Sequence, residues 1–453
     1  MRKYCIKYFL CYNNITRIQV LAIDNKGGVH MLVSLKANNF MIYDSEIEFS
    51  MQANLHHKHF RNNYSNHGEL NVLKTAIIIG PNNSGKTNYV RVVSAIKKII
   101  LNQTPNIQSN LFTDDTVCCL AISFIEGEKE YVFEVKYDTA KHEYKYERFA
   151  VVERDEHKNK REETLLVRDV DNDAYNCSDE SLLPIMQASS RKNILIHLID
   201  TERFPILDEI KGVMTSFASK IDILDMNNIP IKKTIDMLKL SNASKQKIVN
   251  FILNADLSLD DYRYLDDDEL KLVITPEGPA TDSTKPQENA LAIGNSLMEM
   301  LHLTSFYKGI PVPSMLFDST GTKKIAAVAS YIIDALENER ILIVDELDNS
   351  LHFKLSRAII ALFNNELNKN AQLIATVHDV SLLDCKTLFR KEQIWFSHKD
   401  RDTAYLYPLS EFTAERDGIR NTTDLIERYR QGVFGALPDP DLFQSLMEVR
   451  SNG

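Results

Sequence analysis

The sequence lacks the cysteine pattern of a disulfide-bonded or zinc-binding protein. Its six cysteines are scattered over 453 residues and none belongs to a Cys-x-x-Cys pair, whereas disulfide frameworks and zinc sites show regular, paired spacings. Cys118 and Cys119 are adjacent in an expected strand, so their side chains should point to opposite faces. We therefore expect a protein of the reducing cytoplasm.

Long apolar runs are also missing. No segment approaches the roughly 20 apolar residues that a membrane-spanning helix needs. The N-terminus begins basic, but Lys7 interrupts its apolar stretch and no small-residue cleavage site follows, so we predict neither a signal peptide nor an anchor. No internal repeat or long heptad pattern is visible, and we expect neither an extended coiled-coil arm nor a membrane partner.

Positive charge is in short supply. The chain has 53 Lys and Arg against 63 Asp and Glu, a net charge of −10. This balance argues against a protein that coats nucleic acid by bulk electrostatics, although it leaves room for a local basic groove. A composition of 44% hydrophobic and 26% charged residues is that of an ordinary soluble globular protein.

Apolar patterning predicts an α/β fold whose nucleotide-binding lobe comes from both ends of the chain. An alternating strand is expected within 42–51, a His- and Asn-rich loop at 52–72, a buried strand at 74–79 and a helix at 87–101. Residues 117–168 suggest an antiparallel sheet, and 264–290 suggest loop with an isolated strand. The expected divisions are an N-terminal extension at 1–30, the first half of the lobe with an antiparallel β subdomain at 31–190, a helical insertion at 191–290 and the second half at 291–453.

The run Gly80-x-x-x-x-Gly85-Lys86-Thr87 matches the phosphate-binding P-loop pattern. Backbone N–H groups of such a loop surround phosphates at a helix N-terminus, and glycines avoid a Cβ that would collide with the phosphate or the turn. Lys86 should reach the β and γ phosphates, and the Thr87 hydroxyl should bind Mg²⁺. The loop residues Asn82, Asn83 and Ser84 complete the predicted ATP-binding set.

A second apolar strand, 340–344, ends in Asp345 and Glu346. Parallel strands deliver their C-terminal residues to the ligand crevice, where the P-loop also lies. Asp345 should hold Mg²⁺ and Glu346 should act as the general base on the attacking water. His378 follows the next expected strand, 371–376, and should contact the γ-phosphate and that water.

A further anion site is predicted at residues 318–324, where Ser319, Gly321 and Thr322 open an expected helix at 322–338. Read alone, this run would be a plain helix cap. Its position one helix upstream of the two carboxylates suggests that it meets a γ-phosphate held by another subunit.

Together these residues resemble ABC-type ATPases of the SMC, RecF and OLD-like lineage, and most closely the AAA-annotated ATPases of abortive-infection phage defence. The resemblance rests on 31–40, the P-loop, 318–324 as signature motif, 345–352, 376–379 and the late run Tyr429-x-x-Gly432-x-Phe434-Gly435-Ala436. Two positions depart from the relatives: Asp318 replaces a Glu, and Met41 replaces a basic residue. Gln103 and Gln108 are the candidates for the Mg²⁺-coordinating glutamine of such sites.

The resemblance implies an ABC-type ATPase lobe that hydrolyses ATP in a homodimer or higher homo-oligomer. Each γ-phosphate would lie between the P-loop of one copy and Ser319 and Gly321 of the other, with Asn349 in the segment that crosses the interface. A nuclease domain in this chain would need a cluster of carboxylates on strands, and the 75 residues that follow His378 hold no convincing one. The resemblance therefore implies that the toxic activity belongs to a separate effector such as a nuclease.

Three functions remain open from the sequence. The first is a regulatory ATPase of an anti-phage system, with DNA or a phage protein as trigger. The second is a RecF- or SMC-like DNA-repair or chromosome-maintenance ATPase that binds DNA in an ATP-gated way. The third, a soluble transporter ATPase, fits less well because the Leu-Ser-Gly-Gly-Gln signature is absent from the sequence.

Overall fold

The computed structural model describes residues 28–54, 59–154, 160–255, 258–274, 299–400, 403–420 and 422–437, with the side chains of 271–274 left out. Nearly all of the expected N-terminal extension lies outside these residues, as does the larger part of the expected loop at 264–290. None of the described helices is long and apolar enough to cross a membrane.

The six-stranded sheet carries the P-loop. Its strand order is β11-β15-β16-β5-β17-β18, and all neighbouring strands run parallel except β17 and β18. The bounds are β5 (Thr75–Ile79), β11 (Ile221–Asp225), β15 (Ile341–Asp345), β16 (Gln372–Val377), β17 (Ile394–Asp400) and β18 (Thr403–Pro408). Every residue of β5, β15 and β16 is buried, as expected for parallel strands covered on both faces.

Alternate residues of β5 face two different hydrophobic cores. Ile78 packs in the core shared with the antiparallel sheet, whereas Ile77 and Ile79 pack in the core on the opposite face. This follows from the two-residue period of a strand. The strand is therefore held from both sides, and so is the loop that leaves its C-terminal end.

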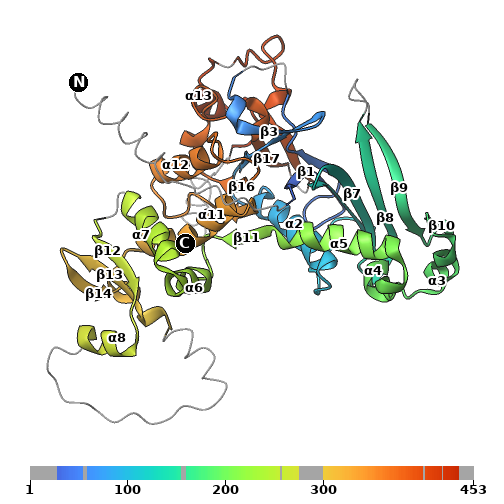
Figure 1. Ribbon diagram of the computed structural model, residues 1–453. Helices are drawn as coiled ribbons and strands as arrows, with labels where there is room; N and C mark the ends of the chain where they lie inside the picture. Colours follow the sequence, from blue (N-terminus) through green and yellow to red (C-terminus); the bar gives the residue numbers. More distant parts are fainter. Residues whose placement is uncertain are drawn as a thin grey trace, which may run out of the picture.

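A seven-stranded antiparallel sheet lies beside this lobe, with the order β10-β9-β8-β7-β6-β1-β2. Figure 1 shows its long strands on one side of the molecule, in green and teal. The bounds are β1 (His30–Asn38), β2 (Ile47–Ser50), β6 (Val117–Glu126), β7 (Lys129–Asp138), β8 (Glu143–Arg154), β9 (Lys160–Asp169) and β10 (Ala174–Cys177). The predicted antiparallel β subdomain is present, and two strands, β1 and β2, come from before the P-loop.

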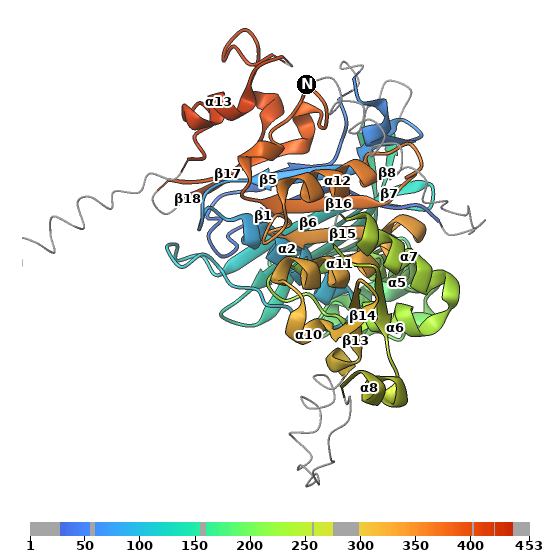
Figure 2. The ribbon, with the colours of Figure 1, turned by 90° about the vertical axis from the view of Figure 1, so that its left-hand side faces the viewer.

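Helices fill the space between and outside the sheets (Figure 2). Helix α2 (Lys86–Ile100) is buried along most of its length. Helix α5 (Pro205–Ser219) covers the antiparallel sheet, where Phe217 stacks on Phe124 with ring centroids 4.0 Å apart. Four helices pack on the face of the six-stranded sheet that lies away from the antiparallel sheet: α6 (Lys232–Leu240), α7 (Asn242–Asn254), α11 (Thr320–Glu337) and α12 (Phe353–Phe363).

Two smaller sheets and several short elements complete the fold. One sheet is β12 (Asp261–Tyr264), β13 (Leu303–Tyr307) and β14 (Ile310–Pro313), and the other is the hairpin of β3 (Tyr64–His67) and β4 (Leu70–Leu73). The short helices are α3 (Leu183–Ala188), α4 (Leu195–Leu198), α8 (Asp267–Ile274), α10 (Ser314–Phe317) and α13 (Leu425–Arg430). Single 3-10 turns are η1 (Arg61–Asn63), η2 (Glu180–Leu182), η3 (Thr201–Arg203), η4 (Val380–Leu382), η5 (Lys391–Gln393) and η6 (Leu409–Glu411).

Three sequence-based expectations differ from this architecture. The expected loop at 52–72 contains the β3–β4 hairpin, and the expected loop at 264–290 begins with helix α8. The expected helical insertion at 191–290 is not purely helical, because it supplies β11, a strand of the six-stranded sheet. β11 has the mixed sequence Ile-Asp-Ile-Leu-Asp, which carries too weak a pattern to be recognised without its partner β15.

Candidate functional site

The P-loop joins β5 to α2, and the tertiary structure requires glycine at both of its ends. A Cβ on Gly80 would lie 2.1 Å from the backbone oxygen of Ser397. Gly85 has a φ of +114° and caps α2, a conformation that favours glycine. The buried Tyr43 hydroxyl donates to the backbone oxygen of Gly85 at 2.7 Å, so the β1–β2 connection also supports the loop.

Lys86 is buried, with 6% of its surface exposed. Its Nζ donates to the backbone oxygens of Gly80 at 2.7 Å and Pro81 at 2.8 Å. Burial lowers the pKa of Lys86 to about 8, against the opposing charges of Asp345 and Glu346. Its neighbour Ser84 has a buried Oγ without a hydrogen-bond partner among the described residues. Both groups therefore suit an incoming phosphate, which would supply negative charge and acceptor oxygens.

Parallel pairing brings the other predicted motifs to the same edge of the sheet. Val344 of β15 lies opposite Ala375 of β16, and Val377 of β16 lies opposite Ile79 of β5. The C-terminal ends of these three strands are therefore adjacent. Asp345 is the last residue of β15, and His378 and the P-loop follow β16 and β5 directly, so the predicted motifs meet at this edge.

Thr376 ties the two carboxylate residues together. Its hydroxyl donates to Oδ1 of Asp345 at 2.6 Å and accepts the backbone N–H of Glu346 at 2.7 Å. Asp345 is 8% exposed. This bond holds one carboxylate oxygen of Asp345 in place at the sheet edge.

Glu346 is held by two amide side chains. Its Oε2 accepts from Nδ2 of Asn349 at 2.8 Å and from Nδ2 of Asn227 at 2.9 Å. These two hydrogen bonds, from Asn349 and then Asn227, lower the pKa of Glu346. The other oxygen, Oε1, lies 3.6 Å from Nε2 of His378. Glu346 has a φ of 58°, an uncommon conformation outside glycine that clusters at functional sites.

Asp348 positions His378. Its Oδ2 accepts the backbone N–H groups of His378 at 2.8 Å and Asp379 at 2.5 Å. The histidine side chain is 38% exposed. The loop after β16 is thus attached to the loop after β15, and the imidazole faces the carboxylate of Glu346.

A cavity of about 400 Å³ lies against the P-loop. Glu346 and His378 line it with all of the loop from Asn82 to Thr87. Gln108 lines it as well, whereas Gln103 does not, so Gln108 is the better placed of the two glutamine candidates. Residues without a predicted role complete the wall: Met41, Ile42, Asn88, Arg91, Ser109, Leu111 and Phe112.

The C-terminal run from Tyr429 to Ala436, which carries part of the family resemblance, lies on the other side of the P-loop. Tyr429 and Arg430 line a second, wider cavity of about 810 Å³ together with Gly80 to Ser84 and His378. Tyr429 is buried and its hydroxyl donates to the backbone oxygen of Ala436 at 2.6 Å. Phe434 stacks on Phe396 of β17 with centroids 4.7 Å apart. The motif therefore anchors the C-terminal segment beside the site.

Residues at this edge fit a single Mg²⁺ bound together with phosphate. The structure describes no group of three or more His, Cys, Asp or Glu residues able to hold a metal ion. Mg²⁺ needs few protein ligands, because it keeps several waters and is bound through one or two carboxylates plus substrate phosphates. Asp345 would supply a carboxylate, and Thr87, which is exposed at the start of α2, would supply a hydroxyl.

The signature residues lie apart from the P-loop cavities. Ser319, Gly321 and Thr322 line neither of the two cavities beside the P-loop. Ser319 caps α11 by accepting the backbone N–H of Thr322 at 3.1 Å, and the two hydroxyls are 2.9 Å apart. Thr322 is buried, whereas Ser319 is exposed. The predicted helix cap is therefore present, and its exposed residue Ser319 can contact another molecule, whereas the buried Thr322 cannot.

Asp318 turns away from this exposed surface. Its carboxylate accepts from the hydroxyls of Ser305 and Ser314, both at 2.6 Å, and of Tyr307 at 2.8 Å. Burial and Asp318 raise the pKa of Tyr307 to about 12. Asp318 thus fastens the signature segment to the three-stranded sheet.

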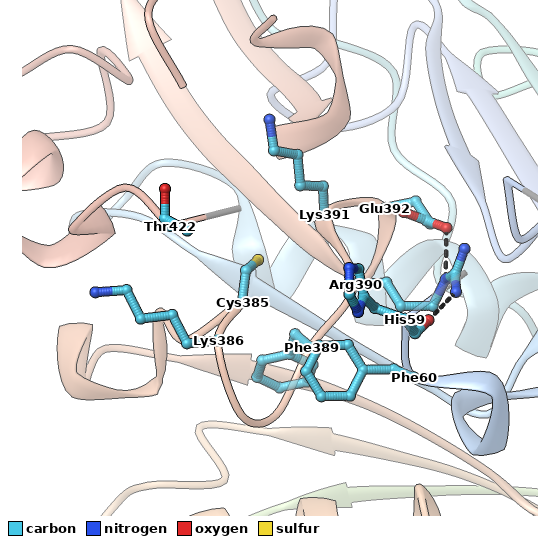
Figure 3. Close-up of a pocket in the computed structure, with 9 residues that line it drawn as sticks. All are labelled: His59, Phe60, Cys385, Lys386, Phe389, Arg390, Lys391, Glu392 and Thr422. Atoms are coloured by element: carbon cyan, nitrogen blue, oxygen red, sulfur yellow. Dashed lines mark hydrogen bonds and ion pairs between the residues drawn. The ribbon is translucent and has the colours of Figure 1, made fainter. Parts of the chain in front are cut away.

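A separate cavity of about 240 Å³ shares no lining residue with the cavities at the P-loop (Figure 3). Arg390 donates to Glu392 at 2.7 Å and to the backbone oxygen of His59 at 2.5 Å, as the dashed lines show. Burial raises the pKa of Cys385 to about 12, so its thiol is not a ready nucleophile.

Sequence reasoning missed Asn227 and the hydroxyl of Thr376. Thr376 stands at the end of a recognised strand, so its position was a usable signal. Asn227 carried none, because it lies 119 residues before Glu346 in a segment expected to be an insertion.

A protein-family model covers more than half of this chain. A family model described as "AAA domain, putative AbiEii toxin, Type IV TA system" matches residues 76–384. No match was found among curated protein sequences.

Solved structures with similarity include three heads of SMC proteins. One, bound to the C-terminal winged-helix domain of ScpA, has a TM-score of 0.42 and 12% identity, covering 83% of this chain and 98% of the other. The head domain from Thermotoga maritima has a TM-score of 0.36, 12% identity and the same coverage. The Pyrococcus furiosus head with an extended coiled coil, bound to the C-terminal domain of ScpA, has a TM-score of 0.38 and 11% identity, covering 88% and 100%. Similarities this low carry no information about activity or partners.

Proposed function

From the premise that this chain belongs to the AAA-domain family whose model it matches, we propose that it hydrolyses ATP and acts as a regulatory subunit of an anti-phage defence system. One observation carries the ATPase part: the P-loop, Asp345, Glu346 and His378 lie at the C-terminal ends of three adjacent parallel strands, where Glu346, His378 and loop residues Asn82 to Thr87 line one cavity.

Each side chain has a defined task in this proposal. Lys86 leaves the carbonyl oxygens of its own loop and pairs with the β and γ phosphates. The N-terminus of α2 also stabilises the negative charge of these phosphates. Asp345 and Thr87 hold Mg²⁺, which would neutralise charge on the phosphates when bound. Oε1 of Glu346 accepts a proton from the attacking water, and His378 contacts that water and the γ-phosphate.

The site is proposed to be completed by a second copy. Ser319 is exposed at the N-terminus of α11 but lies outside both cavities at the P-loop of its own chain. The backbone N–H groups at a helix N-terminus suit an anion. In the proposed dimer the exposed Ser319 and the partly exposed Gly321 of one copy meet the γ-phosphate on the P-loop of the other.

A mixing experiment tests the shared site. Lys86→Ala protein and Ser319→Arg protein should each turn over ATP slowly. Their mixture should regain a clear fraction of wild-type activity, because one composite site then has both an intact P-loop and an intact signature. Two inactive variants that stay inactive when mixed, although they form mixed dimers, contradict the shared site. Absence of turnover in the wild-type protein contradicts the ATPase itself.

The regulatory part rests on the family description, which names a toxin of a type IV toxin–antitoxin system. We propose that a separate effector, such as a nuclease, is held or released by the ATPase. Purification of the native complex should yield such an effector, and the amount retained should depend on ATP. Tight, salt-dependent DNA binding by the isolated chain without any co-purifying effector would instead support the DNA-repair alternative.

A further inference from the structure

The loop after β11 is held by hydrogen bonds beside Asp345, the last residue of β15. Met226 is fully buried, and its backbone N–H donates to the backbone oxygen of Asp345 at 3.1 Å. The backbone N–H of Asn227 donates to Oδ1 of Asp225 at 2.8 Å. These bonds fix the direction in which the loop presents the Asn227 side chain.

Asn227, Asn349 and Glu346 form a closed ring of hydrogen bonds. Nδ2 of Asn349 donates to Oδ1 of Asn227 as well as to Oε2 of Glu346, both at 2.8 Å. Nδ2 of Asn227 closes the ring on the same Oε2 at 2.9 Å. Both donors therefore use one oxygen of Glu346, and Oε1 is the oxygen left facing His378.

The ring is connected to the signature helix within the same chain. Lys324, one turn beyond the start of α11, donates from Nζ to Oδ1 of Asn349 at 2.9 Å and to Oγ of Ser350 at 3.2 Å. A Cβ on Gly321 would lie 3.0 Å from the backbone oxygen of Ser350. The N-terminal turn of α11 and the residues that hold Glu346 are thus in direct contact.

We propose that Asn227 is a positioning residue for hydrolysis. Together with Asn349 it immobilises Oε2 of Glu346, so that Oε1 faces the nucleotide cavity. Lys324 couples this arrangement to α11, the helix that begins at the signature motif. This inference rests on the proposed ATPase function. A general base gains much of its efficiency from being held within hydrogen-bond reach of the proton it removes. Contact of a second copy at Ser319 would reach Glu346 through Lys324 and Asn349.

Substitution of Asn227 tests the proposal. Asn227→Ala should lower kcat about 10-fold and leave the Kd for ATP within about 2-fold, because Asn227 does not line the nucleotide cavity. Asn227→Asp should lower kcat further, since it has the same shape but places a like charge against Glu346. Lys324→Met should lower kcat by a smaller factor of about 3. The matched control is Asn228→Ala, an exposed neighbour outside the ring, which should leave both constants unchanged.

Three results would overturn these claims, two of them the inference alone and one the proposed function as well. Wild-type kcat retained by both Asn227 variants overturns the inference and leaves the ATPase function standing. Equal losses in Asn227→Ala and Asn228→Ala also overturn it, because the loop alone would then explain the effect. A wild-type protein without ATP turnover overturns the proposed function and the inference with it. Far-UV circular dichroism and a thermal melt of each variant confirm that folded proteins are compared.

Discussion

The two large sheets bury charged side chains for different purposes. In the antiparallel sheet, Arg168 and Glu147 are 1% and 3% exposed, with Nε and Oε1 3.1 Å apart. Arg168 also donates to the backbone oxygens of Ser190 and Asn193, and Glu147 accepts the backbone N–H of Leu195. This pair is fully enclosed and cannot meet a ligand.

At the edge of the six-stranded sheet, the buried Lys86 lines a cavity, and the buried Asp345 directly precedes Glu346, which lines the same cavity. Lys86 and Asp345 are nearly as buried, at 6% and 8% exposed. Among the described residues, Lys86 donates to the backbone carbonyls of Gly80 and Pro81, and the carboxylate of Asp345 accepts through one of its oxygens from the hydroxyl of Thr376. A closed ion pair fixes structure, whereas charges of both signs kept near an opening are arranged to receive another molecule. The comparison predicts that substitutions of buried charges in the antiparallel sheet lower stability, whereas substitutions at the edge of the six-stranded sheet lower ATP turnover.

The largest expected effect is on turnover at the cavity. Glu346→Gln should lower kcat on the order of 10³-fold, because the amide cannot accept a proton from water. ATP binding should persist, and the variant should accumulate as an ATP-bound dimer. Steady-state turnover, equilibrium ATP titration and size-exclusion chromatography with ATP measure these quantities. Wild-type hydrolysis by this variant would remove Glu346 from the role of base.

The next effect is on stability in the antiparallel sheet. Arg168→Met should lower the free energy of unfolding by about 3–5 kcal/mol, because Glu147 is left as a buried, unpaired charge. The Kd for ATP should be unchanged at temperatures where the protein stays folded. Urea unfolding and ATP titration check both. A loss of ATP affinity without a loss of stability would erase the contrast between the sheets. The double variant Arg168→Met, Glu147→Leu should recover part of the stability.

The smallest effect sharpens the comparison within the six-stranded sheet. Thr376→Val removes the hydroxyl that bridges Asp345 and the backbone of Glu346, at nearly constant volume. We expect kcat to fall about 10-fold, with a modest loss of Mg²⁺-dependent ATP affinity, since a mispositioned carboxylate weakens its metal contact. Thr376→Ser keeps the hydroxyl and should stay near wild type. Equal kcat in both variants would show that the bridge has no part in hydrolysis.

Sequence motifs predicted much of this molecule. The resemblance to AAA-annotated ATPases of the abortive-infection group is confirmed by the family match over 76–384, and the α/β lobe with its antiparallel sheet is confirmed by the strand order. Helix α2 and strands β5, β15 and β16 lie within a residue or two of the predicted bounds. The roles of the individual site residues stay predictions.

Other parts escaped the sequence for physical reasons. Strand β3 of the β3–β4 hairpin is polar and gives no apolar alternation. Tyr43 reaches the P-loop from the connection between β1 and β2, beside which Phe49 of β2 packs on Tyr89 of α2 with ring centroids 4.6 Å apart. Asp318 lies in the predicted signature motif, yet the hydroxyls of Ser305 and Tyr307 in β13 and of Ser314 in α10 draw its carboxylate inward. A linear motif does not show which way a side chain turns when its partners come from elsewhere in the chain.

The P-loop and the apolar strands were determined by local sequence, because a turn that needs glycine and a strand that needs continuous apolar residues are specified within ten residues. The geometry around Glu346 is local in part, because Asn349 lies three residues away, but the contact of Asn227 with Glu346 was decided by the tertiary structure. Asn227 meets Glu346 across 119 residues of sequence, because β11 pairs with β15 in the same sheet. Such pairing depends on the packing of the whole core, and no spacing of residues along the chain encodes it.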